Sequence, residues 1–275
     1  MKSTVRIPFS QNDDCWADEL MWDRKKVIKA HMKGNGASEK EAKELLHVYK
    51  DDKGKAIGNT IRTEGCMLTS LAMVLRLLDK GRERPAWTPK LLNDEAHERH
   101  FYTLAGLSMV PLYADIVSEV TQGEVQLCAK EDYFPGEPAW PRNYASTSLL
   151  VRAYRRLSKV DRSHFAVMLK IGTYDDTFAS HYLLLDPSHP GDPDDDDVAV
   201  LDPAMPEGRK LPWHLGKSAK CLCEDPDIKE AWKKANIEPL QIGGVWLFAR
   251  WRTRNDPLLL GPMVEILASE MKSKR

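Results

Sequence analysis

Cys66 stands at the start of a helical pattern, a position where a thiol can serve as a nucleophile. Apolar residues follow it at the spacing of an amphipathic helix, at Leu68, Leu71, Ala72, Leu75 and Leu78. The unpaired backbone N–H groups and the dipole at a helix N-terminus favour a thiolate over a thiol. The same place also suits a small buried cysteine in a core helix, because free cysteine is among the most buried residue types.

Two downstream His/Asp pairs are able to activate such a thiol. A thiolate that attacks an amide carbonyl needs an imidazole to protonate the leaving amine, and an acid or amide to orient the imidazole. The chain offers His181 with Asp202, and His164 with Asp186. In an antiparallel hairpin the first residue of one strand lies near the last residue of the next, so both spacings fit. The two pairs would lie at opposite ends of the strands, so only one can face Cys66.

The spacing of apolar residues, which predicts the elements that must position these residues, changes from helical to strand-like near the middle of the chain. Helices are predicted at 66–78, 89–98, 108–121 and 148–157, at 257–271 near the C-terminus, and after the capping box Ser38-Glu39-Lys40-Glu41. Strand-like runs occupy 164–171, 181–186, 198–202 and 245–251, while 130–146, rich in proline and aromatic residues, is expected to be a surface loop. We therefore predict one α+β domain over residues 1–275, in which an N-terminal helical part carrying the Cys66 helix packs on a C-terminal antiparallel β-sheet.

Composition excludes several classes of function. Forty Lys and Arg residues against 41 Asp and Glu give a formal net charge of -1, so no global positive field favours a nucleic-acid partner. The apolar runs are shorter than the ~18 residues of a membrane span, and the N-terminus resembles no signal peptide. A chain made in the cytoplasm is expected. The five cysteines form no C-x-x-C pair, which argues against a disulfide framework or zinc ribbon.

Three segments, in a fixed order, resemble one known family. Ile7-Pro8-Phe9-Ser10-Gln11-Asn12-Asp13 is a short motif around a glutamine, Gly65-Cys66-Met67-Leu68-Thr69-Ser70-Leu71-Ala72-Met73-Val74-Leu75 is a nucleophile-type helix, and residues 181–203 hold a His strand followed by an Asp-Pro strand. Together they resemble the C39-like branch of the papain-like cysteine peptidases. Met67-Leu68 stand where many relatives carry Gly-Pro, and residues 15–60 and 85–145 match no feature of the family.

This resemblance implies a papain-like fold and a set of roles. Cys66 would be the nucleophile, and Gln11 would donate its side-chain amide to the oxyanion beside the Cys66 backbone N–H. His181 and Asp202 are favoured as the base and its orienter, because Val198-Ala199-Val200-Leu201-Asp202-Pro203-Ala204 with Gly208 is more similar to the family's D-P-A…G ending than the sequence around Asp186 is. His164 with Asp186 is the alternative pair.

Two further signals compete with this interpretation. Cys15-Trp16 is similar to the Cys-Trp pair at the nucleophile of papain itself, but Gln11 lies only four residues upstream and no glycine precedes the cysteine, so Cys15 is the alternative nucleophile. The acidic run Asp192, Asp194, Asp195, Asp196 and Asp197 offers oxygen ligands for Ca²⁺. It departs from the EF-hand pattern, because Asp197 stands where the glycine belongs, and a solvated turn is favoured.

The sequence thus predicts a cysteine hydrolase that cleaves an amide or peptide bond, with no cofactor and no metal. Its expected partners are a peptide, a protein or a peptidoglycan peptide as substrate. Export by a specialised secretion system, as a bacterial effector or toxin with a carrier or immunity protein, is a further expectation. Two alternatives remain: a glutamine deamidase or transglutaminase-type acyl transferase built from the same catalytic parts, and a catalytically inactive papain-like binding module.

Overall fold

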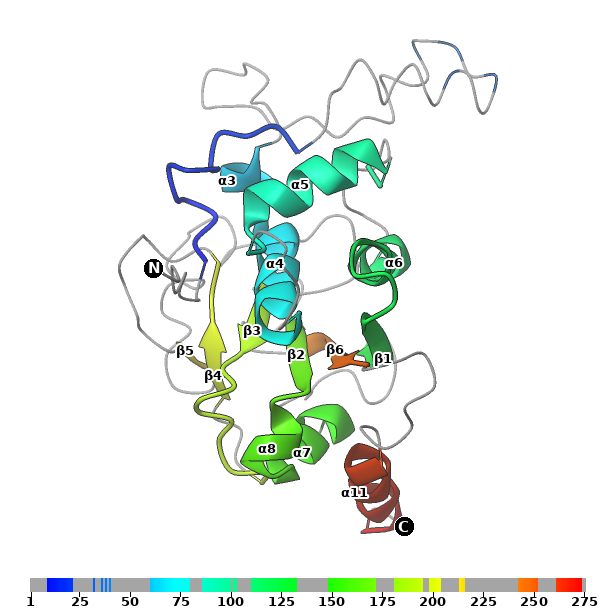
Figure 1. Ribbon diagram of the computed structural model, residues 1–275. Helices are drawn as coiled ribbons and strands as arrows, with labels where there is room; N and C mark the ends of the chain where they lie inside the picture. Colours follow the sequence, from blue (N-terminus) through cyan, green and yellow to red (C-terminus); the bar gives the residue numbers. More distant parts are fainter. Residues whose placement is uncertain are drawn as a thin grey trace.

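A mixed α+β architecture is seen in the computed structural model of the chain (Figure 1). The structure describes residues 9–21, 32, 36, 38, 40, 60–79, 86–99, 101–102, 110–132, 148–171, 181–194, 198–203, 213–215, 242–251 and 261–273. The helix expected after the capping box at Ser38 falls largely outside these residues. Among the helices described, none combines the length and the apolar character that a bilayer span requires.

The centre of the fold is a six-stranded sheet in the order β1-β6-β2-β3-β4-β5, with every neighbouring pair antiparallel. Its strands are β1 (Val125–Asp132), β2 (Phe165–Ile171), β3 (His181–Leu185), β4 (Val198–Leu201), β5 (Trp213–Leu215) and β6 (Ile242–Arg250). The predicted succession of strands from β2 to β4 is confirmed. β6 returns to the other side of β2, and this places the longest strand beside the first of the succession.

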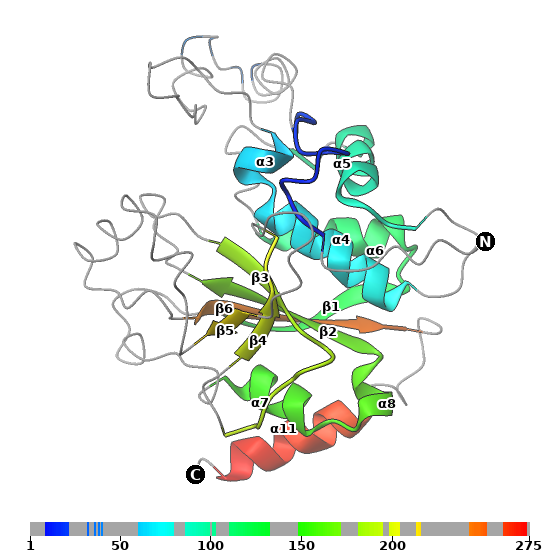
Figure 2. The ribbon, with the colours of Figure 1, turned by 90° about the vertical axis from the view of Figure 1, so that its left-hand side faces the viewer.

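One face of the sheet is covered by α4 (Cys66–Leu78) and α6 (Val110–Val120), and α3 (Ile61–Glu64) and α5 (Pro89–Glu98) lie on the same side, against α4 (Figure 2). α4 packs on β2 and β3, and its apolar side chains join one core with Met168, Tyr182 and Trp246 from the sheet. The expected apolar stripe of the Cys66 helix is therefore its sheet-facing side. Burial of this stripe is the main force that fixes α4 on the sheet.

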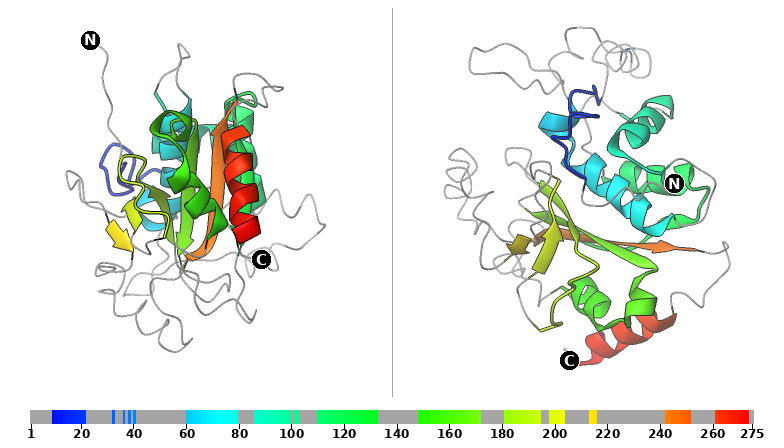
Figure 3. Two further views of the ribbon diagram at one scale, coloured as in Figure 1. Left: turned by 90° about the horizontal axis from the view of Figure 1, so that it is seen from below. Right: turned by 60° about the vertical axis from the view of Figure 1, so that its left-hand side comes forward.

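The opposite face is covered by α7 (Leu149–Arg156), α8 (Lys159–Arg162) and α11 (Gly261–Ser273). Phe165, Val167 and Leu169 of β2 point into this second core, while Ala166 and Met168 point toward α4. Because both faces are covered, the central strands are continuously apolar instead of alternating. α7 and α11 lie side by side against the sheet in the view from below (Figure 3).

The sequence missed several short or irregular elements. β1 was unpredicted and includes residues 130–132, which the sequence assigned to a surface loop, so that boundary is wrong. β5, α3 and α8 were also unpredicted, and each has only three or four residues. Elements of one turn or one pleat carry no periodic signal, because periodicity needs a longer window. The other helices and strands predicted within the described residues are present, with boundaries displaced by a few residues.

Gly65 forms the tight junction that sets where α4 begins. Its N–H donates to the Ile61 carbonyl at 2.8 Å, and its own carbonyl accepts from Thr69 N–H at 2.8 Å. A Cβ built on Gly65 would lie 2.6 Å from Ile61 Cγ2 and 2.8 Å from Ile61 Cα, and closer still to the Ile61 carbonyl oxygen. With φ of −79°, the backbone conformation itself tolerates other residues. Close approach, and not backbone conformation, therefore requires glycine immediately before Cys66.

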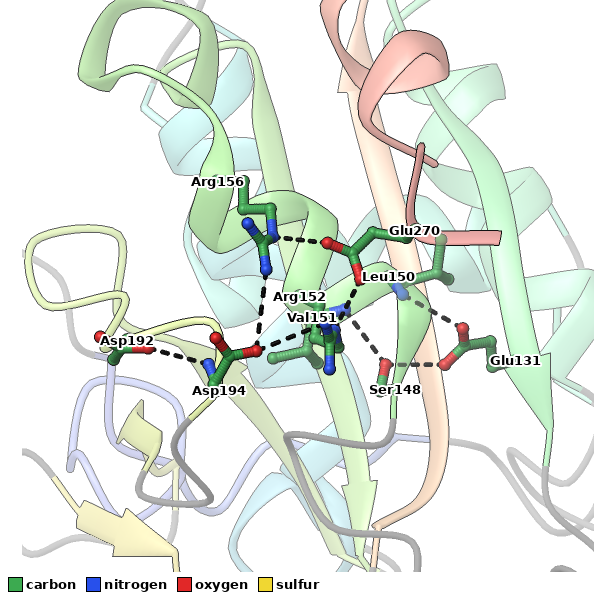
Figure 4. A network of polar contacts seen from close by, with 9 residues as sticks. All are labelled: Glu131, Ser148, Leu150, Val151, Arg152, Arg156, Asp192, Asp194 and Glu270. Atoms are coloured by element: carbon green, nitrogen blue, oxygen red, sulfur yellow. Dashed lines mark hydrogen bonds and ion pairs between the residues drawn. The ribbon is translucent and has the colours of Figure 1, made fainter. Parts of the chain in front are cut away.

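A partly buried polar network joins the elements on the α7 and α11 side of the sheet (Figure 4). Glu270 of α11, with only 5% of its side chain exposed, pairs with Arg152 at 2.7 Å and with Arg156 at 2.5 Å on α7. Both arginines also reach Asp194, in the connection between β3 and β4. The network thus ties α7 and α11 to the loop that joins the His181 strand to the Asp202 strand.

Candidate functional site

His181 and Asp202 meet at one end of the sheet. His181 is the first residue of β3, and Asp202 follows the last residue of β4. The strands are antiparallel, with Leu184 opposite Leu201, so the beginning of one meets the end of the other. His181 Nε2 lies 2.6 Å from Asp202 Oδ1. Only 13% of the His181 side chain and 2% of the Asp202 side chain are exposed, so this contact is shielded from water.

Cys66 lies beside the same imidazole. Its side chain is close enough to influence the protonation of His181. α4 is seated on β3, and Ser70 Oγ, one turn after Cys66, donates to the Tyr182 carbonyl at 3.1 Å. This contact fixes the N-terminal turn of α4 beside the first residues of β3. The imidazole therefore neighbours both a thiol at a helix start and a buried carboxylate.

The surroundings of His181 act in opposite directions on its protonation. Burial lowers the pKa of His181, while the charge of Asp202, its hydrogen bond and the contacts with Cys66 raise it, with a net rise from 6.5 to about 10. The imidazolium is therefore favoured through the neutral pH range. A protonated imidazole beside a thiol is the arrangement that stabilises a thiolate.

Gln11 is held between the segment that precedes Cys66 and the residue that follows Asp202. Its backbone N–H donates to the Pro203 carbonyl at 2.6 Å. Its side-chain Nε2 donates to the Arg62 carbonyl at 2.8 Å, four residues before Cys66. Gln11 Oε1 is buried and has no hydrogen-bond partner among the residues that the structure describes. The predicted glutamine motif is thus attached to both chain segments that carry the other site residues.

The rest of this N-terminal segment is fastened to α3 and α5. Arg62 N–H donates to the Ala17 carbonyl at 2.8 Å, and Ile61 N–H donates to the Glu19 carbonyl at 3.1 Å. Asn93 Nδ2 and His97 Nε2, both on α5, each lie 2.9 Å from the Leu20 carbonyl oxygen. No sequence signal pointed to these contacts, because they join residues more than forty positions apart.

The alternative pair lies elsewhere in the sheet. His164 immediately precedes β2, while the other end of that strand, Ile171, is paired with His181. Asp186 follows β3 and accepts hydrogen bonds from Ser188 N–H at 2.8 Å and from His189 Nδ1 at 3.2 Å. Asp186 therefore closes the turn after β3, at the end of the hairpin opposite the Cys66 contact.

The other described cysteines differ from Cys66 in their surroundings. Cys15 is exposed on the N-terminal segment, and its backbone N–H donates to Asp13 Oδ1 at 2.9 Å. Burial raises the pKa of Cys128 to about 12, against a weaker lowering by a backbone hydrogen bond from Ala249. Cys128 is therefore a thiol at neutral pH, which makes it an internal reference for Cys66. Cys221 and Cys223 lie outside the described residues.

The acidic run after β3 contributes to structure at the positions that are described. Asp192 Oδ1 accepts from the Asp194 N–H at 2.9 Å, and the Asp194 carboxylate faces Arg152 and Arg156. Asp195, Asp196 and Asp197 lie outside the described residues. Within the described ranges, no group of three or more His, Cys, Asp or Glu side chains is arranged to hold a metal ion.

Comparison with known proteins adds no relative to this picture. No family model, no curated protein and no solved structure matches the chain.

Proposed function

We propose that this chain is a cysteine hydrolase with a papain-like fold of the C39-like type, which cleaves an amide bond. Cys66 is the nucleophile, His181 the general acid and base, Asp202 its orienter, and Gln11 an oxyanion donor. One observation carries the proposal: a single buried imidazole is hydrogen-bonded to a buried carboxylate and lies beside a thiol at a helix start. Nucleophile, base and orienting acid in that order are the parts that acyl transfer needs.

The first half of the reaction forms an acyl-enzyme. The Cys66 thiolate attacks the amide carbon, a C–S bond forms, and the C=O π electrons move to oxygen. When the tetrahedral intermediate collapses, the C–N bond breaks and the His181 imidazolium gives its proton to the departing amine. Asp202 keeps the ring oriented through the 2.6 Å contact and stabilises its positive charge.

The second half returns the free enzyme. A water molecule gives a proton to the now neutral imidazole and attacks the thioester carbon. The C–S bond breaks, the carboxylic acid leaves, and the thiolate and imidazolium are restored. If a primary amine replaces the water, the same residues transfer the acyl group, so hydrolysis and acyl transfer differ only in the acceptor.

Two donors are available for the negative charge that develops on the carbonyl oxygen. The Cys66 backbone N–H belongs to the first turn of α4, where N–H groups have no intrahelical partner. The Gln11 amide has two N–H bonds, and donation of one to the Arg62 carbonyl holds the side chain while the other stays available. Removal of one such donor typically lowers the rate by about 10²–10³.

The arrangement of helices and strands supports the proposal of a papain-like fold in its general plan. A nucleophile helix packs on an antiparallel sheet, and neighbouring strands supply the histidine and the acid. A binding module without turnover would not need a buried ion pair at its centre, since burying charged groups costs free energy unless they are well paired. The arrangement therefore favours an enzyme over the inactive module.

The substrate class is tested by direct product analysis. The full chain is incubated with a proteome-derived peptide mixture, with muropeptides and with glutamine-containing proteins, each with and without a primary amine, and products are identified by mass spectrometry. New peptide or muropeptide ends would support hydrolysis, whereas conversion of glutamine to glutamate or to an amine adduct would support the deamidase or transferase. Cys66→Ser should remove every product and Cys128→Ser none. Products that persist in Cys66→Ser would overturn the proposal.

A further inference from the structure

Trp16 contacts both residues that precede Gln11. Its indole Nε1 donates to the Ser10 carbonyl at 2.7 Å. Its ring meets the ring of Phe9 edge to face, with 5.7 Å between centroids and 77° between planes. Ser10 and Phe9 are the last two residues of the chain before Gln11, so Trp16 holds the backbone from which the Gln11 side chain extends.

This contact is buried and has a firm support on each side. Phe9 is 3% exposed and Trp16 is 8% exposed. The Phe9 N–H faces Met73 Sδ of α4 at 3.4 Å. Trp16 is followed directly by Ala17, whose carbonyl accepts from Arg62 N–H at 2.8 Å. The indole therefore bridges the start of the segment, which rests on α4, to its middle, which is fastened to α3.

We propose that Trp16 is a positioning residue for Gln11, an inference that rests on the proposed function. Gln11 itself is bonded to Arg62 and Pro203, and these two bonds fix its amide only if the preceding backbone is also fixed. Trp16 supplies that third constraint through the Ser10 carbonyl. An oxyanion donor must hold its place before the reaction, because a displacement of about 1 Å can cost on the order of 10²-fold in rate.

Trp87 provides a matched control for this role. It is 5% exposed, belongs to the same hydrophobic core as Trp16, and its Nε1 donates to Asp79 Oδ2 at 2.5 Å. Asp79 lies just beyond the C-terminal end of α4, whereas Cys66 is the first residue of that helix. Trp16→Phe and Trp87→Phe thus each remove one buried indole N–H from the same core, and only the first removes it beside Gln11.

Two probes separate positioning of Gln11 from activation of Cys66. With N-acetylglycinal, the Cys66 sulfur adds to the aldehyde carbon and the π electrons move to oxygen, so the adduct carries an oxyanion and His181 keeps its proton. With iodoacetamide, the sulfur displaces iodide from a CH₂ group and no oxyanion forms. The dissociation constant for the aldehyde therefore depends on Gln11, whereas the alkylation rate reports the thiolate alone.

We expect Trp16→Phe to weaken aldehyde binding about tenfold, an effect smaller than the roughly 10²–10³ expected for loss of a donor in Gln11→Ala. Its alkylation rate should stay within about twofold of the parent. Trp87→Phe should match the parent in both assays. In a Gln11→Ala background, Trp16→Phe should have no further effect, because residues that act through one another are not additive. Replacement of Trp16 by benzothienylalanine, which keeps the ring shape and lacks only the N–H, should reproduce Trp16→Phe and guards against misfolding of that variant.

The outcomes distinguish this inference from the proposed function. An equal loss in Trp87→Phe, or a further loss from Trp16→Phe in the Gln11→Ala background, would show that Trp16 acts only through general stability. Unchanged aldehyde binding in Trp16→Phe and in the benzothienylalanine variant, with a loss in Gln11→Ala, would overturn the inference alone. A Gln11→Ala variant that binds the aldehyde as the parent does, or a parent that is alkylated rapidly but binds no aldehyde, would remove the oxyanion role of Gln11 and with it the role of Trp16.

Discussion

Replacement of Asp202 by asparagine should separate the orientation of His181 from its charge. Asparagine has the size of aspartate and can still accept a hydrogen bond from the ring, but it carries no negative charge. The contact that it replaces is 2.6 Å long, and the Asp202 side chain is only 2% exposed. Water therefore screens this charge very little, and its removal should be felt almost fully by His181.

The size of the effect follows from what holds the proton on His181. The pKa stands at about 10 against an ordinary 6.5, because the charge of Asp202 and its hydrogen bond, aided by Cys66, outweigh the lowering by burial. Each pH unit corresponds to about 1.4 kcal/mol. The site therefore favours the imidazolium over the neutral ring by on the order of 5 kcal/mol more than water does. Without the carboxylate charge, burial becomes dominant, and we expect the pKa of His181 to fall by at least about two units, which is roughly 10²-fold in the ion-pair equilibrium.

The assay follows alkylation of Cys66 by iodoacetamide from about pH 5 to pH 9, quantified by mass spectrometry of the Cys66 peptide. At about pH 7, Asp202→Asn should slow alkylation by up to about 10²-fold, because the imidazolium–thiolate pair loses about that factor relative to the neutral imidazole–thiol pair. NMR of labelled histidine should show the His181 titration at lower pH. Asp186→Asn is the matched control, because Asp186 also accepts from a histidine, His189, at the other end of the hairpin. An Asp202→Asn variant alkylated as fast as Asp186→Asn would refute the electrostatic argument.

Three further predictions test the thiol, the helix junction and the stability of the ion pair. Cys66 should react with iodoacetamide at about pH 6 at least 10²-fold faster than Cys128, whose pKa burial raises to about 12, and comparable rates would count against an activated thiol. Gly65→Ala should lower the unfolding free energy by about 1–3 kcal/mol in urea titrations, whereas Gly261→Ala, where a Cβ meets nothing within 4 Å, should change it little; equal effects would contradict the close-packing argument. Because the pKa of His181 is raised on folding, the stabilisation that it provides is complete below pH 6.5 and is lost as pH rises through about 10, so the stability difference between the parent and His181→Ala should shrink across that window. A difference independent of pH would contradict the ion pair.

The sequence predicted the elements that bury a regular apolar pattern. α4, α5 and α7 follow helical spacing, and β2 and β3 are largely apolar runs, so the α+β class and the succession of β2, β3 and β4 could be inferred. β1 was not predicted because its pairing with β6 contains a bulge between Leu127 and Ala129, which interrupts the alternation of side chains along the strand. Its sequence, Val125-Gln126-Leu127-Cys128-Ala129-Lys130-Glu131-Asp132, is half polar and is stabilised by the neighbouring strand.

The sequence indicated the candidate site residues more clearly than the contacts that hold them in place. Cys66 was marked by its place at a helix start, and His181 and Asp202 by their places at strand ends, which are local features. The contacts of Gln11 with Pro203 and Arg62 depend on how distant segments meet, and nothing in the local sequence specifies them. The contact of Trp16 was not predicted for the same reason, since the Cys15-Trp16 pair pointed to the Cys15 thiol and not to the indole, which donates to the Ser10 carbonyl.

The two Asp-Pro steps show why strand direction decides which acid belongs to the site. Leu185-Asp186-Pro187 and Leu201-Asp202-Pro203 are alike in sequence, and each begins at the end of a strand. β3 starts at the Cys66 contact and runs away from it, so Asp186 ends up in the far turn, where it accepts from Ser188 N–H. β4 returns, so Asp202 arrives beside His181. The variants Asp202→Asn and Asp186→Asn therefore make the same chemical change at the two ends of one hairpin. Only the change at Asp202, which follows the returning strand, should affect Cys66.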